Sequence, residues 1–187
     1  MMWLKMSKEF REYTEAEIPG IKKYPPVLRA LMLFKIRREN PSADAVYMFR
    51  YCLMFIHGSS LVKKIVARRY MRLLVYRYGI FFDFKDCSHF GKGLKFPHPS
   101  SIIIGSDVKV GDNCVIYQNV TIGAARAGDA AKGKYPEIGN NCTLFAGCKV
   151  LGSVKVADGT TVGANAVLLK STEKDSTYAG VPAERIK

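Results

Sequence analysis

The sequence predicts a mainly β protein, a parallel β-helix preceded by α-helices, and two patterns in its 187 residues support this. In the C-terminal half an aliphatic residue returns every sixth position, with one interruption. These residues are Ile104, Val110, Ile116, Ile122, Ile138, Leu144, Val150, Val156, Val162 and Leu168. An α-helix repeats every ~3.6 residues and a half-buried strand every ~2, whereas stacked β-helix coils repeat every six. The second pattern is apolar residues at helical spacing in the N-terminal part.

Each six-residue unit also holds a compact residue four positions after its aliphatic residue. The residues at this position are Val108, Cys114, Val120, Cys142, Cys148, Val154, Thr160 and Ala166. One bulky and one small inward residue per unit suits a narrow coil whose faces are short strands. Glycine directly follows five of the aliphatic residues, at Gly105, Gly111, Gly123, Gly139 and Gly163. We expect these glycines to adopt positive φ at the corners of the coil, where glycine costs least.

Residues 1–82 follow helical rules instead. Two prolines, Pro25 and Pro26, precede a predicted helix at 27–38, and Ser42 is the expected N-cap of a second helix at 45–57. The turn Gly58-Ser59-Ser60 precedes a third helix at 61–78. We therefore expect a helical, basic region at 1–82 and a β-helix domain at 83–187. Within that domain, residues 124–136 interrupt the period and are predicted to form a projecting loop, where function often concentrates.

The chain has a formal net charge of +13, which favours an anionic partner such as membrane lipid, a phosphorylated cofactor or nucleic acid. No nucleic-acid-binding motif accompanies the charge, so we expect no nucleic-acid partner. The predicted helix at 61–78 interleaves basic with apolar and aromatic residues, as membrane-surface helices do. Peripheral membrane contact through residues 45–80 is one reading of this pattern. Packing of the apolar face on the coil or on another subunit is the other.

No export signal or membrane span is expected. The N-terminal residues include acids where a signal peptide needs an apolar core, and the apolar window at 46–62 is interrupted by Arg50 and His57. Three of the five cysteines occupy the small inward position, and no CxxC spacing is present, so we expect reduced structural thiols. The expected location is the cytoplasm, with peripheral attachment at the inner face of the membrane as the alternative.

Four segments carry a resemblance to a known family. They are FGKGLKFPHPSSIIIG at 90–105, VIYQNVTIG at 115–123, the loop end KYPEIG at 134–139, and the tail AGVPAERI at 179–186. In this order they resemble the left-handed β-helix (hexapeptide-repeat) acyltransferases, within them the serine acetyltransferase branch. The resemblance covers 83–187 and not the shorter, more basic region 1–82. It implies a left-handed coil, acetyl-coenzyme A as donor, no metal, and a homotrimer with sites between neighbouring coils.

The resemblance places the family's catalytic groups on particular residues of this chain. His98 corresponds to the catalytic histidine and Asp83 to its aspartate partner, although Asp86 in the same stretch is an alternative. A neutral imidazole suits removal of a hydroxyl proton at neutral pH. The backbone N–H of Ala124, just after Gly123, corresponds to the donor that stabilises the oxyanion. Residues that the resemblance implies for coenzyme A are Gly123, Ala124, Ala146, Ala164, Lys170 and Arg185.

Three positions depart from the serine acetyltransferase pattern. Pro97 stands where the family has an aspartate before its catalytic histidine, and Lys134 and Tyr135 stand where it has arginine and a second histidine. In the family these groups hold the charged ends of serine. Their replacement favours another acceptor hydroxyl, such as that of a free or lipid-linked sugar in surface polysaccharide synthesis. Tyr135 could stack on a sugar ring or merely anchor the loop, and both readings are open.

Three alternative functions compete with sugar acetylation. Serine O-acetylation in cysteine biosynthesis belongs to the same reaction class. A β-helix carbonic anhydrase needs three histidines on a metal, but the chain has only His57, His89 and His98, and His57 lies outside the coil. A non-catalytic scaffold or membrane adaptor would leave the His98 segment without a purpose. The sequence thus predicts an acetyl-coenzyme A-dependent O-acetyltransferase.

Overall fold

The computed structural model describes residues 7–18, 20–83 and 89–187. Its internal contacts divide the chain into two units, the second of which spans Tyr78–Lys187. The predicted boundary lay five residues later, after residue 82. The difference arises because Phe81 and Phe82 already form a strand of the coil and pair with Ile103 and Ile104.

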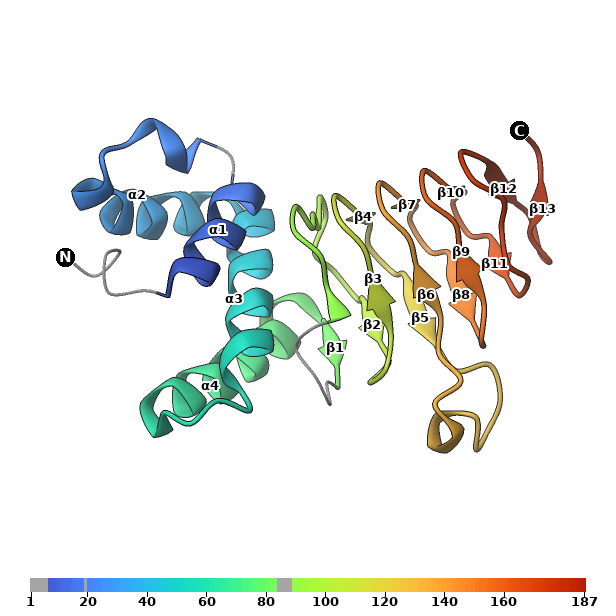
Figure 1. Ribbon diagram of the computed structural model, residues 1–187, viewed down its shortest axis with the longest axis horizontal. Helices are drawn as coiled ribbons and strands as arrows, with labels where there is room; N and C mark the ends of the chain where they lie inside the picture. The colour runs from blue at the N-terminus through green and yellow to red at the C-terminus, as the bar shows by residue number, and fades with distance from the viewer. Residues whose placement is uncertain (1–6, 19, 84–88) are drawn as a thin grey trace. The chain divides into compact units, whose positions relative to one another are not determined.

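The first unit is helical (Figure 1). Its helices are α1 (Lys8–Glu17), α2 (Pro26–Glu39), α3 (Pro41–Phe55) and α4 (Leu61–Tyr78), with a short 3₁₀ helix at Ile21–Lys23. The predicted helices at 27–38 and 61–78 are confirmed. Ser42 is not the N-cap of α3: Asn40 is, and its side chain accepts a hydrogen bond from the Ala43 N–H at 3.1 Å. The reason is Pro41, which lacks an N–H and suits the first helical position, so the helix starts earlier than predicted.

Helix α3 is the core of this unit. Its buried apolar residues include Val46, Met48, Phe49 and Leu53, each at most 2% exposed. These side chains are buried and cannot contact a membrane. Of the segment 45–80 predicted to contact a membrane, only α4 therefore remains as a candidate. Exposed apolar residues on α4 are Leu61, Val62, Ile65 and Tyr76. No helix among the described residues has the length and apolar content needed to cross a bilayer.

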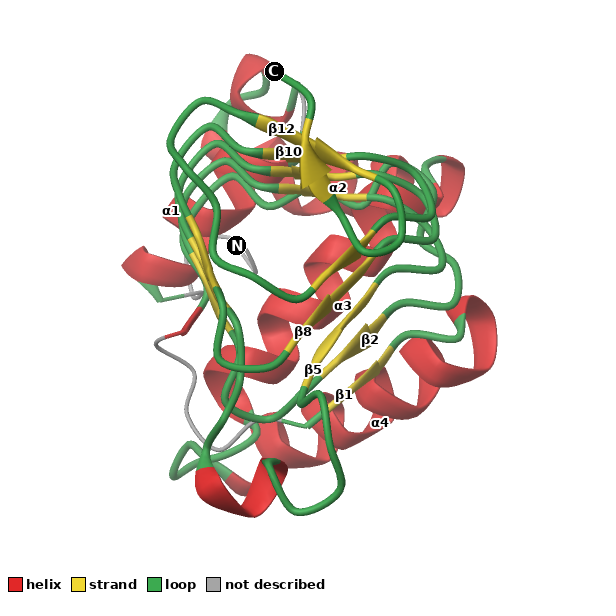
Figure 2. Cartoon of the chain, turned by 90° about the vertical axis from the view of Figure 1, so that its right-hand side faces the viewer, coloured by secondary structure: helices red, strands yellow, loops and turns green. Residues whose placement is uncertain are grey.

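The second unit is a left-handed parallel β-helix, as predicted (Figures 1 and 2). Short strands stack into three sheets, which we name faces A, B and C. Face A contains β1 (Phe81–Phe82), β2 (Ile103–Ile104), β5 (Thr121–Gly123), β8 (Lys149–Leu151) and β11 (Val167–Leu168). Face B contains β3 (Lys109–Val110), β6 (Glu137–Ile138) and β9 (Lys155–Val156). Face C contains β4 (Val115–Ile116), β7 (Thr143–Leu144), β10 (Thr161–Val162), β12 (Thr177–Ala179) and β13 (Glu184–Arg185).

The chain visits the faces in the order A, B, C, so each coil has an A–B, a B–C and a C–A corner. Figure 2 looks along the coil and shows its strands on three sides. Pairing is parallel, except that β13 is antiparallel to β12. All ten periodic aliphatic residues are at most 4% exposed, and the eight compact residues at most 5%. The six-residue period therefore predicted the core of the coil correctly.

The expectation for the five glycines was wrong. None of them has positive φ. The left-handed residues of the coil include four asparagines, Asn113, Asn119, Asn141 and Asn165, together with Ser101, Asp175 and several other glycines. The five serve a different purpose in at least two cases. A Cβ atom at Gly111 would lie 2.7 Å from the carbonyl carbon of Gly139, and one at Gly139 would lie 2.8 Å from the backbone nitrogen of Asp158. Glycine is needed there because neighbouring coils approach closely.

The predicted loop at 124–136 joins β5 to β6 at the A–B corner and contains a 3₁₀ helix, Ala130–Lys132. It projects from the coil below the strands in Figure 1.

Candidate active site

His98 lies at the C–A corner of the first coil. The coil reaches this corner after Lys95, which pairs with Val115 of face C, and it continues to Ile103 of face A. Ser100 donates its N–H to the carbonyl of His98 at 2.8 Å, which closes a tight turn. The imidazole is exposed and Pro97 beside it is partly buried. The residue that the sequence singled out as a base is thus accessible to a substrate.

Two aromatic residues extend from His98 along the same corner. The imidazole and the Tyr117 ring have centroids 6.0 Å apart, and the Tyr117 ring stacks on Phe145 at 5.1 Å with an interplanar angle of 18°. The rings come from three successive coils, because Ile116 pairs with Leu144 in face C. We name His98, Tyr117 and Phe145 the ring column.

Asp83 does not meet His98 within one chain. It directly follows β1 of face A, so it begins an A–B corner, whereas His98 is at the C–A corner. Within the part of the chain that the structure describes, no hydrogen bond joins the two side chains, and Asp83 is exposed. The alternative partner Asp86 lies outside the described residues.

Further predicted residues gather at the A–B corner. Gly123 ends β5, Ala124 opens the loop, and Lys134 and Tyr135 close it; Lys170 follows β11 at the same corner two coils later. A cavity of about 550 Å³ lies between the loop and the coil. Its lining residues are Ala125, Arg126, Asp129, Lys134, Leu151, Gly152, Ser153, Val154 and Leu169. It combines an apolar floor with two cations, one of which, Lys134, is 3.3 Å from Asp129.

Tyr135 anchors the loop to the coil. Its hydroxyl group accepts a hydrogen bond from Ser106 at 3.0 Å. Its ring lies so close to Gly105 that a Cβ atom there would be 2.3 Å from the ring carbon Cε1. Glycine at 105 therefore makes room for the Tyr135 ring. In this chain Tyr135 uses both its ring and its hydroxyl group for anchoring.

The remaining predicted residues lie at the C–A corner, on the opposite edge of face A, or in face C. Ala146 and Ala164 lie at the C–A corner, after β7 and β10, and the Asn165 N–H donates to the carbonyl of Ala146 at 2.9 Å. Arg185 is in β13 of face C and pairs with Glu173. Within a single chain the predicted site residues therefore lie at two separate corners. The C–A corner holds His98, Pro97, Ala146 and Ala164. The A–B corner holds Asp83, Gly123, Ala124, Lys134, Tyr135 and Lys170.

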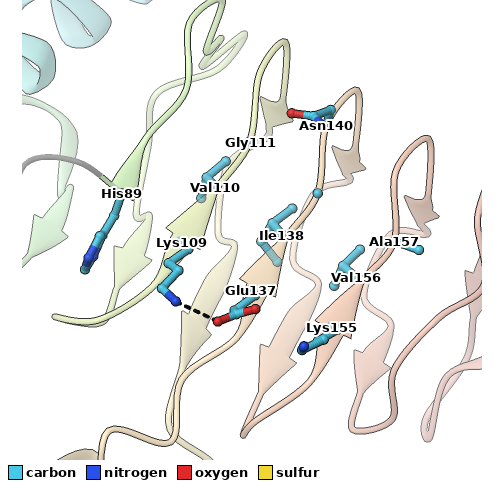
Figure 3. A pocket seen from close by; sticks show the side chains of 11 residues that line it. His89, Lys109, Val110, Gly111, Glu137, Ile138, Asn140, Lys155, Val156 and Ala157 are labelled. Carbon is cyan, nitrogen blue, oxygen red and sulfur yellow. Dashed lines mark hydrogen bonds and ion pairs between the residues drawn. The ribbon is translucent and has the colours of Figure 1, made fainter.

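A separate groove of about 750 Å³ runs over face B and does not contain His98 (Figure 3). Lys109, Glu137 and Lys155 point outward from adjacent strands, and the Lys109 ammonium group is 2.8 Å from the Glu137 carboxylate. The hydrogen bond from Lys109 lowers the pKa of Glu137. His89 borders the groove, and its Nδ1 atom is buried with no hydrogen-bond partner among the described residues.

The other reactive groups of the described chain are poor candidates for chemistry. Burial raises the pKa of the Cys148 thiol to about 12 and that of Cys52 to about 12, so neither supplies a thiolate near neutral pH. Cys114 and Cys142 are buried as well, and Cys87 lies outside the described residues. Among residues 7–18, 20–83 and 89–187, no cluster of three His, Cys, Asp or Glu side chains could hold a metal ion.

The sequence analysis missed Tyr117 and Phe145. Each directly follows a periodic aliphatic residue, Ile116 or Leu144, and in the coil these positions stack one above the other. Arranging the sequence as a grid of coils would have shown the two rings in one column next to the His98 segment.

Comparisons with known proteins support the fold. The family model for bacterial transferase hexapeptide (six repeats) matches residues 135–170. The structure of serine acetyltransferase from Neisseria gonorrhoeae superposes with a TM-score of 0.71 at 20% identity, covering 98% of this chain and 68% of that one. A serine acetyltransferase in complex with CoA superposes with a TM-score of 0.56 at 18% identity, covering 98% and 87%. At these identities the likeness establishes the fold alone.

A curated relative is closer in sequence. A serine acetyltransferase of Staphylococcus aureus (strain COL) is 39% identical over 97 residues, which is 52% of this chain and 45% of the relative. The chain therefore spans about half the length of the curated relatives it matches.

Proposed function

We propose that this protein transfers the acetyl group of acetyl-coenzyme A to a hydroxyl group. The observation that carries the proposal is the exposed imidazole of His98 at a corner of a β-helix coil, in a chain 39% identical over 97 residues to a curated serine acetyltransferase. A known structure of such an enzyme in complex with CoA supports the choice of donor.

His98 acts as the general base in this proposal. It accepts the proton of the acceptor hydroxyl group as the hydroxyl oxygen attacks the thioester carbonyl carbon. The new O–C bond forms and the C–S bond breaks, and the proton passes from the imidazolium to the leaving thiolate. The Ala124 N–H stabilises the oxyanion of the tetrahedral intermediate. The cavity beneath the loop, with Arg126 and Lys134 at its rim, offers cations for the coenzyme A phosphates.

The separation of the two groups of residues supports a homotrimer. His98 and Ala124 lie at opposite edges of face A, so one chain does not bring the base and the oxyanion donor together. Packing flat faces around a threefold axis would place the C–A corner of one copy beside the A–B corner of the next. Asp83, too, would meet His98 only across such an interface.

Serine is the first acceptor to test, because the curated relatives are serine acetyltransferases. A sugar hydroxyl is the second candidate, and the observation that favours it is Tyr135. Since the Tyr135 side chain is bound to Ser106 and packed on Gly105, it cannot replace the charged group that would hold the serine carboxylate. Pro97, likewise, offers no charge for the serine ammonium group.

The acceptor is tested by measuring kcat/KM for coenzyme A release with L-serine and with a panel of free and lipid-linked sugars. A serine value within tenfold of the best sugar supports cysteine biosynthesis. A sugar value at least about 100-fold above serine supports polysaccharide acetylation, because a site that lacks charge partners loses heavily on a zwitterion.

Membrane attachment through α4 accompanies the sugar candidate. The helix carries six cations between Lys63 and Arg77 besides its exposed apolar residues. Each cation near an anionic surface contributes roughly 1 kcal/mol. We expect binding to vesicles containing anionic lipid that weakens as salt rises; equal binding to neutral vesicles would contradict this attachment.

A further inference from the structure

In the ten six-residue units, the residue directly after the periodic aliphatic residue is aromatic only at Tyr117 and Phe145; in three others it is Leu151, Ala157 or Leu169. In five units the residue after the periodic aliphatic residue is glycine. At the C–A corner beside His98 this position holds Tyr117 and then Phe145, whereas the next coil returns to Gly163. Among the coils that the structure describes, aromatic rings therefore occupy this position only in the two coils that follow the His98 turn; Gly163 and then Ala179 hold it in the next two coils.

The rings of Tyr117 and Phe145 are not part of the hydrophobic core of the coil. Phe145 is 38% exposed, and Tyr117 is partly buried with its ring stacked on Phe145. The core positions beside them are already filled by Ile116 and Leu144, each 0% exposed. The rings thus add an apolar aromatic surface outside the core. Its nearer ring, Tyr117, has its centroid 6.0 Å from that of the imidazole, and Phe145 stacks on Tyr117.

We propose that the ring column is the acceptor platform and that the acceptor is a pyranose ring. A pyranose has an apolar face of C–H groups that can lie on an aromatic face, and its rim of hydroxyl groups would present one of them to His98. L-serine has no such face, so the column would contribute nothing to its binding. The inference rests on the proposed acetyl transfer and names its acceptor class.

Tyr135 does not compete for this task, because its ring covers Gly105 at the A–B corner. The stacking on a sugar that the sequence analysis considered for Tyr135 is therefore assigned to Tyr117 and Phe145.

The test compares ring-shaped with open-chain acceptors of the same stereochemistry. Coenzyme A release is measured with methyl hexopyranosides and with the open-chain alditols of the same stereochemistry, alongside L-serine. Phe145→Leu removes the ring and keeps much of the bulk, and Phe145→Tyr restores a ring. Tyr76→Ala, at an 89% exposed ring on α4, is the control outside the column.

We expect wild type to prefer one pyranoside over its alditol. Phe145→Leu should raise KM for that pyranoside roughly 3- to 10-fold, the range expected for one aromatic contact, while KM for acetyl-coenzyme A changes less than about twofold. Phe145→Tyr should recover most of the loss, and Tyr76→Ala should match wild type. Saturation-transfer NMR should show the pyranoside ring protons in contact with wild type more strongly than with Phe145→Leu.

Three results would overturn the inference while leaving acetyl transfer intact. They are equal use of pyranoside and alditol, a rise in KM for acetyl-coenzyme A instead of the acceptor, and a Phe145→Leu protein that changes its oligomeric state in light scattering without changing acceptor KM. The last result would mean that a second copy of the chain covers the rings. Absence of coenzyme A release with every acceptor would instead refute the proposed function.

Discussion

At Gly139 the spacing of the coils leaves no room for a side chain. A Cβ atom there would lie 2.8 Å from the backbone nitrogen of Asp158 and 3.0 Å from the carbonyl oxygen of Val156, and backbone cannot move aside as a side chain can. At Gly123, by contrast, a Cβ atom would meet nothing within 4 Å. Two glycines at equivalent places in the period therefore have different reasons to be glycine.

We predict that Gly139→Ala lowers the free energy of unfolding by about 1–3 kcal/mol, the usual cost of overpacking. Gly123→Ala should change it by less than about 0.5 kcal/mol. Urea unfolding followed by circular dichroism at equal protein concentration measures both. Equal destabilisation by the two variants would show that a backbone conformation shared by these glycines, and not coil spacing, selects glycine.

Helices α1 and α3 are joined by a buried ion pair between Glu17 and Arg50. The two side chains are 1% and 3% exposed, and the Arg50 guanidinium group also lies 4.0 Å from the centre of the Tyr13 ring. Removing one partner of a buried pair leaves an uncompensated charge. The pair Arg185–Glu173 offers a matched comparison, since its side chains are 50% and 69% exposed.

We predict that Glu17→Gln destabilises the helical unit by about 3–5 kcal/mol, whereas Glu173→Gln changes stability by less than about 1 kcal/mol. Thermal unfolding monitored by circular dichroism distinguishes them. A Glu17→Gln protein as stable as wild type would mean that water reaches Arg50.

At the scale of elements, the sequence predicted the coil well because each six-residue unit of the sequence forms one face of the coil. A residue such as Ile122 or Cys142 is inward because of its place in the six-residue unit. Local competition between neighbours was harder to foresee, as when Asn40 capped α3 instead of Ser42. The site was only partly predictable: His98 was found by its segment, but a separation of fifteen positions does not reveal that Asp83 and His98 occupy different corners.

At the scale of the whole molecule, the candidate site is divided between two corners of the coil. Two inactive variants, each damaged at a different corner, should therefore restore activity when they assemble together. His98→Ala damages only the C–A corner, and Ala124→Pro removes an N–H only at the A–B corner. If the two chains mix at random in equal amounts, one interface of the three in each mixed trimer, or about a quarter of all interfaces, would combine an intact corner from each chain. Co-expression of the two should therefore restore activity that neither variant has alone.

The measurement is coenzyme A release by the co-purified mixture, with light scattering to confirm three copies. A single-chain site gives no recovery on mixing, and a monomer at micromolar concentration would contradict the trimer directly.

The central claim, acetyl transfer with His98 as base, is tested most directly by coenzyme A release from acetyl-coenzyme A in the presence of the best acceptor. His98→Ala should lower kcat by at least about 100-fold and leave the Kd of coenzyme A within about twofold, because a base acts in the transition state. His89→Ala, at the separate groove on face B, should match wild type. Wild-type turnover by His98→Ala would contradict the account.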